Sequence, residues 1–379
     1  MLTSLMRPFF RKGQARSFVL PGAVSDSSRI LCIDPGDLTD LLFHVPLVNA
    51  IRQRYPRARI DFLVPEKHAP LIKPSGLTKQ CLAYKDGQLN PWRPSFSALL
   101  RQLSTQNYDV TLVMSVTPRP RLELAGLASG AALRIGPSHA ESWPAINFEI
   151  RPGEGDEQYL GDRVRHMGPF LGLSPADLGT RWPLPMDQVR QMAQQIHFHK
   201  PNPDQMLVGV DPTVSKTGFT LSQENFQFLI RQLTSQLICR VIALGDPTQR
   251  EKLDKLETRL SDVPIGLPRS TILETVLLLS QCDLFLAGNT DLFHFAVALG
   301  VPTIGLFAPQ DPPAWEPRGR RKARVIRLPK EGKIDLETLM ETVEAVTEGR
   351  TSTATTVIAE SDAPSDADET GTPPAPGQD

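Results

Sequence analysis

The chain has 379 residues, of which 40% are hydrophobic and 22% are charged, and its formal net charge is −1. This length exceeds what one hydrophobic core usually holds, so we expect two domains, and the composition excludes a chain that is disordered throughout. Residues 351–379 carry six acidic side chains and no lysine or arginine, so the remainder has a formal charge of +5. This excess is small and scattered, and it does not indicate nucleic-acid binding.

The amino-terminal half begins with a segment that has two interpretations. Residues 1–25 start with large apolar side chains at helical spacing among several basic ones, and we interpret them as a flexible terminus or as a shallow membrane-surface anchor. From residue 29 onward, short apolar runs alternate with amphipathic stretches, which is typical of βα units around a parallel sheet. Strands are predicted over 29–33, 59–64, 80–84, 108–114 and 133–136, and helices over 40–54, 95–103 and 122–129. Residues 26–182 are thereby predicted to form one Rossmann-like, doubly wound domain.

A polar segment with prolines at both ends, residues 183–205, is the predicted interdomain linker, with a short helix over 187–196. A second alternating series follows, which predicts a Rossmann-like domain over 206–349. Its predicted strands are 206–210, 240–244, 264–267, 283–287, 302–307 and 323–327, and its predicted helices are 222–235, 247–259, 270–279, 291–299 and 335–346. Residues 350–379 are expected to be a disordered acidic tail.

Cysteine spacing and hydropathy bear on the compartment. Four cysteines are widely spaced in or beside apolar runs, which favours reduced core thiols over disulfides or a zinc site: Cys32, Cys81, Cys239 and Cys282. No window reaches 18 uninterrupted apolar residues, so we expect no membrane-spanning helix and a cytoplasmic site of action.

Ligands of open parallel sheets bind beyond the carboxyl ends of the strands, so the loop that follows each domain's first strand is the first place to look. The first such loop reads Asp34-Pro-Gly-Asp-Leu-Thr-Asp40. Asp40 is a candidate general base near a helix start, and the alternative is that Asp40 or Thr39 simply caps the helix. The cluster lacks a repeated ligand spacing, so we expect no metal site there.

Two further segments follow strands of the second domain. Small and hydroxyl residues surround Lys216 after the strand at 206–210, and this lysine either contacts phosphate oxygens or is an ordinary solvated side chain. The turn Gly288-Asn-Thr-Asp291 opens a helix, whose amino terminus is a natural anion site, and Thr290 and Asp291 lie in it. His294 lies one turn further on, and its alternative role is purely structural.

These segments, in this order, resemble those of the glycosyltransferase family 9 heptosyltransferases. Leu38-Thr-Asp-Leu-Leu-Phe-His-Val-Pro-Leu-Val-Asn-Ala-Ile-Arg52 resembles the family's opening helix, with Thr39 in place of a glycine. Asn289-Thr-Asp-Leu-Phe-His294 is similar to the family's Asp-Thr-Gly-x-x-His signature without its glycine. Leu306-Phe-Ala-Pro-Gln-Asp-Pro312 followed by Trp315 is similar to the family's Phe-Gly-Pro-Thr-Asp-Pro and tryptophan pattern.

The resemblance implies a GT-B fold, in which two Rossmann-like doubly wound domains face each other across a cleft. Residues 26–182 would form the acceptor-side domain, and residues 206–349 would form the domain that binds the nucleotide sugar. The resemblance also implies an inverting transfer of a heptose-like sugar from a nucleotide diphosphate to a lipopolysaccharide-core or related envelope glycan, with Asp40 as the base. Lys216, Thr290, Asp291 and His294 would bind the donor diphosphate. By the same resemblance, Gly245 and Gln249 are candidate nucleotide contacts.

No metal or other cofactor is expected, and the family pattern makes ADP the expected donor nucleotide. The expected acceptor is lipid-linked or a core oligosaccharide, reached with or without contact with the cytoplasmic face of the inner membrane. The altered glycines leave a second hypothesis: a catalytically impaired paralogue that binds nucleotide sugars or acts as a scaffold.

Overall fold

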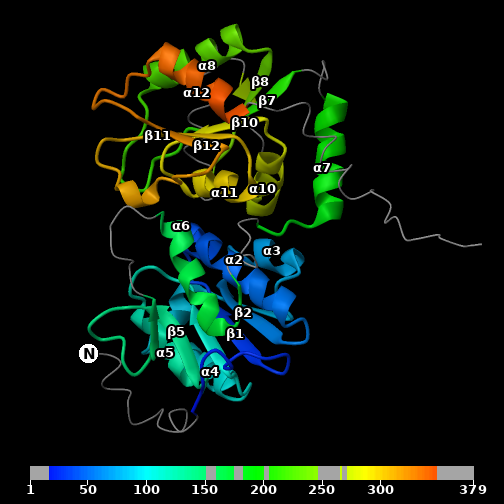
Figure 1. Ribbon diagram of the computed structural model, residues 1–379, viewed down its shortest axis with the longest axis vertical. Helices are drawn as coiled ribbons and strands as arrows, with labels where there is room; N and C mark the ends of the chain where they lie inside the picture. Colours follow the sequence, from blue (N-terminus) through cyan, green and yellow to red (C-terminus); the bar gives the residue numbers. More distant parts are fainter. Residues whose placement is uncertain are drawn as a thin grey trace, which may run out of the picture. The chain divides into compact units, whose positions relative to one another are not determined.

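Six parallel strands form the sheet of the amino-terminal half, in the order β3-β2-β1-β4-β5-β6 (Figure 1). They are β1 (Arg29–Ile33), β2 (Arg59–Pro65), β3 (Gln80–Tyr84), β4 (Val110–Val113), β5 (Leu133–Pro137) and β6 (Phe148–Ile150). The central strands are apolar and buried along nearly their whole length, as is usual for parallel sheets covered on both faces.

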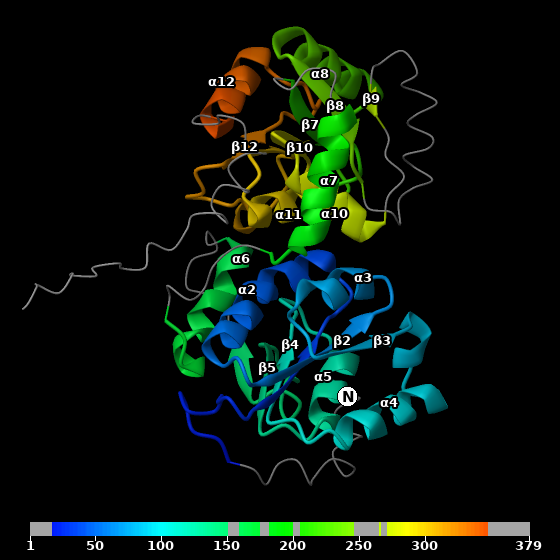
Figure 2. The same cartoon turned by 90° about the vertical axis from the view of Figure 1, so that its right-hand side faces the viewer.

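Helices cover both faces of this sheet (Figure 2). One face carries α2 (Leu38–Arg54) and α3 (Ala69–Ile72), and the other carries α4 (Pro94–Ser104) and α5 (Pro120–Ala128). Alternate residues of β1 serve the two faces, since Ile30 and Cys32 pack toward α2 while Leu31 and Ile33 pack toward α4 and α5. The short helix α6 (Leu160–Arg163) contacts α2.

The sheet of the carboxy-terminal half has the order β12-β11-β10-β7-β8-β9 and is also parallel. Its strands are β7 (Met206–Asp211), β8 (Cys239–Ala243), β9 (Ile265–Gly266), β10 (Leu284–Ala287), β11 (Thr303–Phe307) and β12 (Ala323–Arg327). Two helices, α8 (Gln223–Gln236) and α12 (Leu336–Thr347), cover one face, and α10 (Ile272–Ser280) and α11 (Asp291–Leu299) cover the other. The predicted linker contains α7 (Met186–His199), which contacts α10.

This computed structural model describes residues 17–150, 159–174, 182–199, 205–245, 265–266 and 271–347. Both sheets belong to one unit, Met1–Glu348, and one buried cluster contains side chains of both α2 and α11. The predicted helix over 247–259, the acidic tail and the first sixteen residues lie outside the described residues. The predicted domain boundaries stay predictions.

Most of the predicted elements within the described residues are confirmed, and their ends differ by at most two residues, except that the helix predicted over 187–196 continues to His199. The strand predicted over 108–114 is shorter, because only Val110–Val113 pair with a neighbouring strand. The sequence did not predict β6, α3 and α6, because each is only three or four residues long and shows no clear periodicity. None of the four cysteines, all of which lie in described segments, forms a disulfide.

Each sheet has one point where the chain order reverses direction. In the amino-terminal sheet it lies between β1 and β4, and in the carboxy-terminal sheet it lies between β7 and β10. Loops that leave neighbouring strands at such a point diverge to opposite faces and leave a crevice in which ligands bind. The loops after β1, β4, β7 and β10 therefore define where a site is expected.

Candidate active site

The carboxylate of Asp37 caps α2, which settles the alternative that Asp40 or Thr39 does so. Its Oδ1 accepts hydrogen bonds from the backbone amides of Thr39, at 3.0 Å, and of Asp40, at 3.2 Å. The turn before it is held by Asp34, whose carboxylate accepts the amide of Gly36 and pairs with His68 at 2.6 Å. Gly36 has φ +86°, a left-handed conformation that favours glycine. The side chain of Asp40 is thereby free for another role.

Asp40 lies at the reversal point between β1 and β4. Its carboxylate accepts the hydroxyl of Ser115 at 3.0 Å and the amide of Val116 at 3.3 Å, and the Arg119 guanidinium is 3.9 Å away. Only 4% of the residue is exposed. Burial and the neighbouring Asp37 carboxylate raise the pKa of Asp40 to about 6, although the hydrogen bonds and Arg119 oppose this shift. A carboxylate with this pKa suits a general base near neutral pH.

Lys216 links the two halves of the unit. Its Nζ lies 2.6 Å from Asp291 Oδ1 and 3.4 Å from Asp37 Oδ1, and 5.4 Å from the centre of the Trp315 ring. Its backbone amide donates to the carbonyl oxygen of Asn289 at 2.8 Å. Burial alone would lower the pKa of Lys216, but Asp291 and Asp37 outweigh it, so the pKa is raised and the side chain is a cation. Lys216 is therefore paired with two carboxylates, and its predicted contact with phosphate oxygens stays a prediction.

Asp291 accepts a second hydrogen bond, from the hydroxyl of Thr39 at 2.5 Å. The first turns of α2 and α11 therefore meet, each helix contributing a carboxylate beside Lys216. Because unpaired amides at a helix start favour anions, this arrangement provides cationic and amide donors for a phosphate group. Asp291 is the group that a phosphate would have to displace.

Thr290 caps α11, and its side-chain hydroxyl is already hydrogen-bonded within the protein. Its hydroxyl accepts the amide of Phe293 at 3.3 Å and donates to the carboxylate of Asp211 at 2.6 Å. Asp211 is buried, which raises its pKa, and it also accepts the hydroxyl and amide of Thr213. The Thr290 hydroxyl, which was predicted to donate to a diphosphate, is thus already hydrogen-bonded within the protein. What remains for a ligand at this position is the amino terminus of α11.

His294 is fully buried, and both ring nitrogens are engaged. The amide oxygen of Asn289 lies 3.0 Å from Nε2, so Nε2 donates, and Nδ1 accepts the hydroxyl of Tyr159, also at 3.0 Å. Burial and the Lys216 cation lower the pKa of His294 well below its usual value, so the ring is neutral. Phe43 and Trp315 also contact the ring. Because both ring nitrogens are engaged, His294 has no free polar atom for a diphosphate in this arrangement. Its contact with Asn289 holds the turn that precedes α11.

Asp311 is a site residue to which the sequence analysis assigned no role. Its buried carboxylate accepts the hydroxyl of Thr217 at 2.8 Å, the side-chain amide of Asn289 at 3.1 Å and the backbone amide of Ala308 at 2.7 Å. It thus joins the loops that follow β7, β10 and β11. The sequence feature that could have indicated its role is the segment Phe307-Ala-Pro-Gln-Asp-Pro312, in which Asp311 closely follows a buried strand.

A pocket of about 210 Å³ lies at the reversal point of the carboxy-terminal sheet. It is lined by apolar side chains of α8 and its preceding loop, including Phe219 and Leu221, and by Asp211 and Gly288 at the ends of β7 and β10. Gly245, a predicted nucleotide contact, is buried two residues after β8, and Gln249 lies outside the described residues. The pocket has the position and mixed lining expected of a small-molecule site.

The comparisons with known proteins agree with this geometry. Residues 96–343 match the family model described as glycosyltransferase family 9 (heptosyltransferase). The chain belongs to glycosyltransferase family 9. The lipopolysaccharide core heptosyltransferase OpsX of Haemophilus influenzae is 22% identical over 278 residues, which cover 72% of this chain and 77% of that relative. The resemblance found in the sequence is thus confirmed, and the protein is a glycosyltransferase.

Two solved structures show the fold of this glycosyltransferase to be GT-B. The family 9 glycosyl transferase of Veillonella parvula has a TM-score of 0.68 at 15% identity and covers 85% of this chain and 99% of its own. The ADP-heptose LPS heptosyltransferase II of E. coli has a TM-score of 0.65 at 20% identity, with coverage of 84% and 98%. In the described part of the glycosyltransferase, no helix is long and apolar enough to cross a membrane.

Proposed function

We propose that this glycosyltransferase transfers a heptose-like sugar, with inversion, from an ADP-linked donor to a lipopolysaccharide-core or related envelope glycan. Family membership and the names of the relative and of the E. coli neighbour support the substrate class. The mechanism rests on two charged groups, one associated with the reversal point of each sheet. An ionisable carboxylate, Asp40, lies at one, and the loop bearing a cation paired with two carboxylates, Lys216, leaves the other.

In this mechanism Asp40 takes the proton of the acceptor hydroxyl while that oxygen attacks the anomeric carbon of the donor. The bond between the anomeric carbon and the diphosphate oxygen breaks on the opposite face, and the electron pair leaves with the diphosphate. Lys216 and the amides at the start of α11 stabilise the developing charge, because donors and cations fixed in advance need no reorganisation. Since Lys216 supplies the positive charge, we propose that no metal ion takes part.

The acceptor is proposed to be lipid-linked and to be reached from the cytoplasmic face of the inner membrane. The competing hypothesis, a nucleotide-sugar-binding protein without turnover, predicts donor binding without product. A transfer assay with ADP-heptose distinguishes the two, because only a transferase releases ADP in proportion to glycosylated acceptor.

The nucleotide preference can be measured by thermal unfolding. ADP at about a hundred times its dissociation constant should stabilise the protein by about 2.7 kcal/mol, since a ligand that binds only the folded form stabilises it by RT ln(1 + [L]/Kd). UDP, GDP and CDP at the same concentration should raise the melting temperature less. An equal or larger shift with another nucleoside diphosphate would contradict the choice of ADP.

Replacing Asp291 by asparagine should tighten ADP binding by about tenfold. The carboxylate competes with the diphosphate for Lys216, whereas an asparagine amide oxygen can still accept the hydrogen bonds of Thr39 and Lys216 without a negative charge. Isothermal titration calorimetry measures the affinity, and Asp26→Asn, a change at a surface carboxylate paired with Arg57, is the matched control. Unchanged or weaker ADP binding in Asp291→Asn would show that the carboxylate does not compete.

A further inference from the structure

Tyr159 joins the two halves of the protein through its side-chain hydroxyl. The residue directly precedes α6, and its hydroxyl oxygen lies 3.0 Å from Nδ1 of His294 in α11. Only 5% of Tyr159 is exposed, and burial raises the pKa of its hydroxyl, so the group keeps its proton near neutral pH. The proposed mechanism does not use this hydroxyl, although it contacts the helix at whose start the diphosphate would bind.

A chain of buried hydrogen bonds leads from Tyr159 to the donor side of the site. Asp311 sets its direction, because a carboxylate only accepts hydrogen bonds and therefore faces the side-chain amide nitrogen of Asn289, at 3.1 Å. The amide oxygen of Asn289 then faces Nε2 of His294 at 3.0 Å, so the ring proton is on Nε2 and the electron pair of Nδ1 can accept. The hydroxyl of Tyr159 donates to Nδ1. All four side chains are satisfied by this one arrangement of protons.

The far end of this chain holds the loop that carries Lys216. The carbonyl oxygen of Asn289 accepts the backbone amide of Lys216 at 2.8 Å. The hydroxyl of the next residue, Thr217, donates at 2.8 Å to Oδ1 of Asp311, the same oxygen that accepts the side-chain amide of Asn289. A shift of Asn289 would therefore move the backbone of Lys216, and with it the ammonium group.

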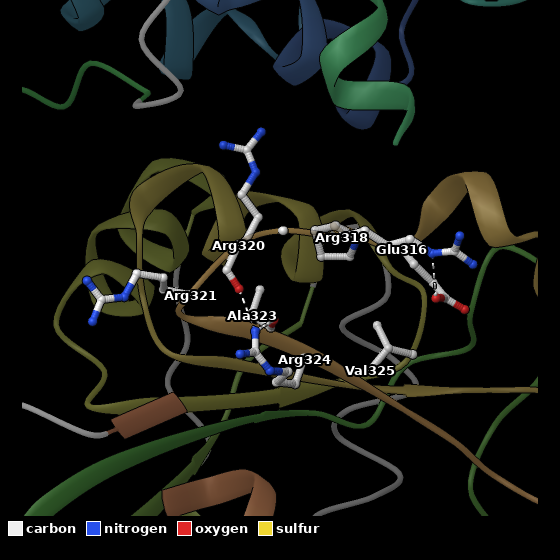
Figure 3. Close-up of a pocket in the computed structure, with 9 residues that line it drawn as sticks. Glu316, Arg318, Arg320, Arg321, Ala323, Arg324 and Val325 are labelled. Atoms are coloured by element: carbon white, nitrogen blue, oxygen red, sulfur yellow. Dashed lines mark hydrogen bonds and ion pairs between the residues drawn. The ribbon is translucent and has the colours of Figure 1, made fainter. Parts of the chain in front are cut away.

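Packing on the amino-terminal side fixes the place of the Tyr159 ring. The ring packs edge-on against Phe43, with ring centres 5.4 Å apart. Gly161 permits this approach, because a Cβ atom there would lie 2.6 Å from the Tyr159 ring and 3.1 Å from that of Phe43. Arg320 points from its loop toward the amino-terminal half (Figure 3), and its guanidinium lies 2.6 Å from the carboxylate of Asp162 in α6. The segment 159–163 is thus fastened to the carboxy-terminal half by an ion pair as well as by the tyrosine hydroxyl.

We propose that Tyr159 positions Lys216 for the donor diphosphate, acting through His294 and Asn289. This inference rests on the proposed function, because it takes Lys216 as the group that stabilises the leaving diphosphate. Without the hydroxyl, a buried ring nitrogen of His294 would lose its donor, and the turn at Asn289 would no longer be held in one arrangement. The half that carries the base would thereby also help to hold the cation for the leaving group.

The test is a double-mutant cycle on the full chain, in which Tyr159→Phe removes the hydroxyl and Asn289→Ala removes the middle of the hydrogen-bond chain. Each change alone should weaken ADP binding by about fivefold and slow sugar transfer by about tenfold, since members of one hydrogen-bond network act together. The double variant should be no worse than Asn289→Ala, whereas independent effects on transfer would multiply to about a hundredfold. Calorimetry measures ADP affinity, and single-turnover kinetics with saturating donor measures transfer.

The matched control is Tyr108→Phe. Tyr108 is also fully buried, and its hydroxyl donates at 3.0 Å to the carboxylate of Asp61 in β2. Losing this hydrogen bond should lower the melting temperature but leave ADP affinity and transfer as in wild type. The control therefore separates the loss of a buried hydroxyl from an effect on the position of Lys216.

ADP affinity and transfer like those of wild type in Tyr159→Phe would refute the positioning role, and so would losses that multiply in the double variant. Nitrogen NMR of protein labelled at its histidines adds a readout that does not require Asn289→Ala to fold. The proton of His294 should be found on Nε2, and the Nδ1 signal should move in Tyr159→Phe but not in Tyr108→Phe. A proton on Nδ1 would contradict the chain. Because ADP binding needs no turnover, wild-type protein without sugar transfer would reject the proposed function and leave the coupling in ADP affinity measurable.

Discussion

Asp40→Asn should lower the rate of sugar transfer by at least about a hundredfold, which is the usual effect of losing a general base, while ADP binds as to wild type. Asparagine keeps the size of the side chain and an oxygen for Ser115 and Val116, but it cannot take a proton. Single-turnover kinetics with saturating donor measures the rate of the chemical step, and calorimetry measures ADP affinity. Turnover like that of wild type would remove Asp40 from the mechanism.

The pH dependence gives a second view of the same group. A base must be ionised to work, and the pKa of Asp40 is raised to about 6, so transfer should increase as the pH rises through this value. Between pH 5 and pH 7 the ionised fraction grows roughly tenfold and then levels off. In Ser115→Ala the hydrogen bond that lowers the pKa is lost, so the midpoint should move to higher pH. A midpoint that stays in place would mean that another group titrates.

Lys216→Gln should reduce transfer by about a hundredfold to a thousandfold, the range seen when one preorganised donor to a developing anion is removed. The substitution also leaves Asp37 and Asp291 next to each other without their shared cation. ADP affinity should fall as well, because the diphosphate is already charged in the ground state. Steady-state kinetics and calorimetry on the same preparation separate the two effects.

Lys216→Arg is the informative companion to this variant. It keeps the positive charge next to Trp315, so it should retain more activity than Lys216→Gln, even though a guanidinium is larger than an ammonium group. If arginine and glutamine were equally damaging, the position would be sensitive to shape and not to charge. If neither reduced transfer, the leaving diphosphate would be stabilised elsewhere.

Much of the architecture follows from local signals. The strands of both sheets are mostly short apolar runs, and β1, β3 and β12 have the predicted bounds. The sequence also placed α11 correctly, since a threonine cap and a glycine at its end delimit the apolar stretch. These signals act over a few residues, so a single sequence is enough to detect them.

The contacts within the candidate active site, in contrast, join residues that are far apart in the sequence. Thr39 meets Asp291 across 252 positions of chain, and Thr290 meets Asp211 across 79. No periodicity or spacing carries such pairings. The first depends on how the two halves pack together, and the second on β7 and β10 being neighbours in one sheet. The ligand contacts predicted for Asp40, Lys216, Thr290, Asp291 and His294 stay predictions. What the sequence did not indicate is that the polar atoms of Thr290 and His294 bind other residues of the protein.

The carboxylate of Asp311 joins three loops that come from three different strands. Flexible loops lose conformational entropy when a ligand orders them, and that loss is subtracted from affinity. Loops already fastened to one buried anchor are spared most of this loss. Damage to that anchor should consequently loosen all three together, so an enzyme altered there would need a higher sugar-nucleotide concentration to reach the same occupancy.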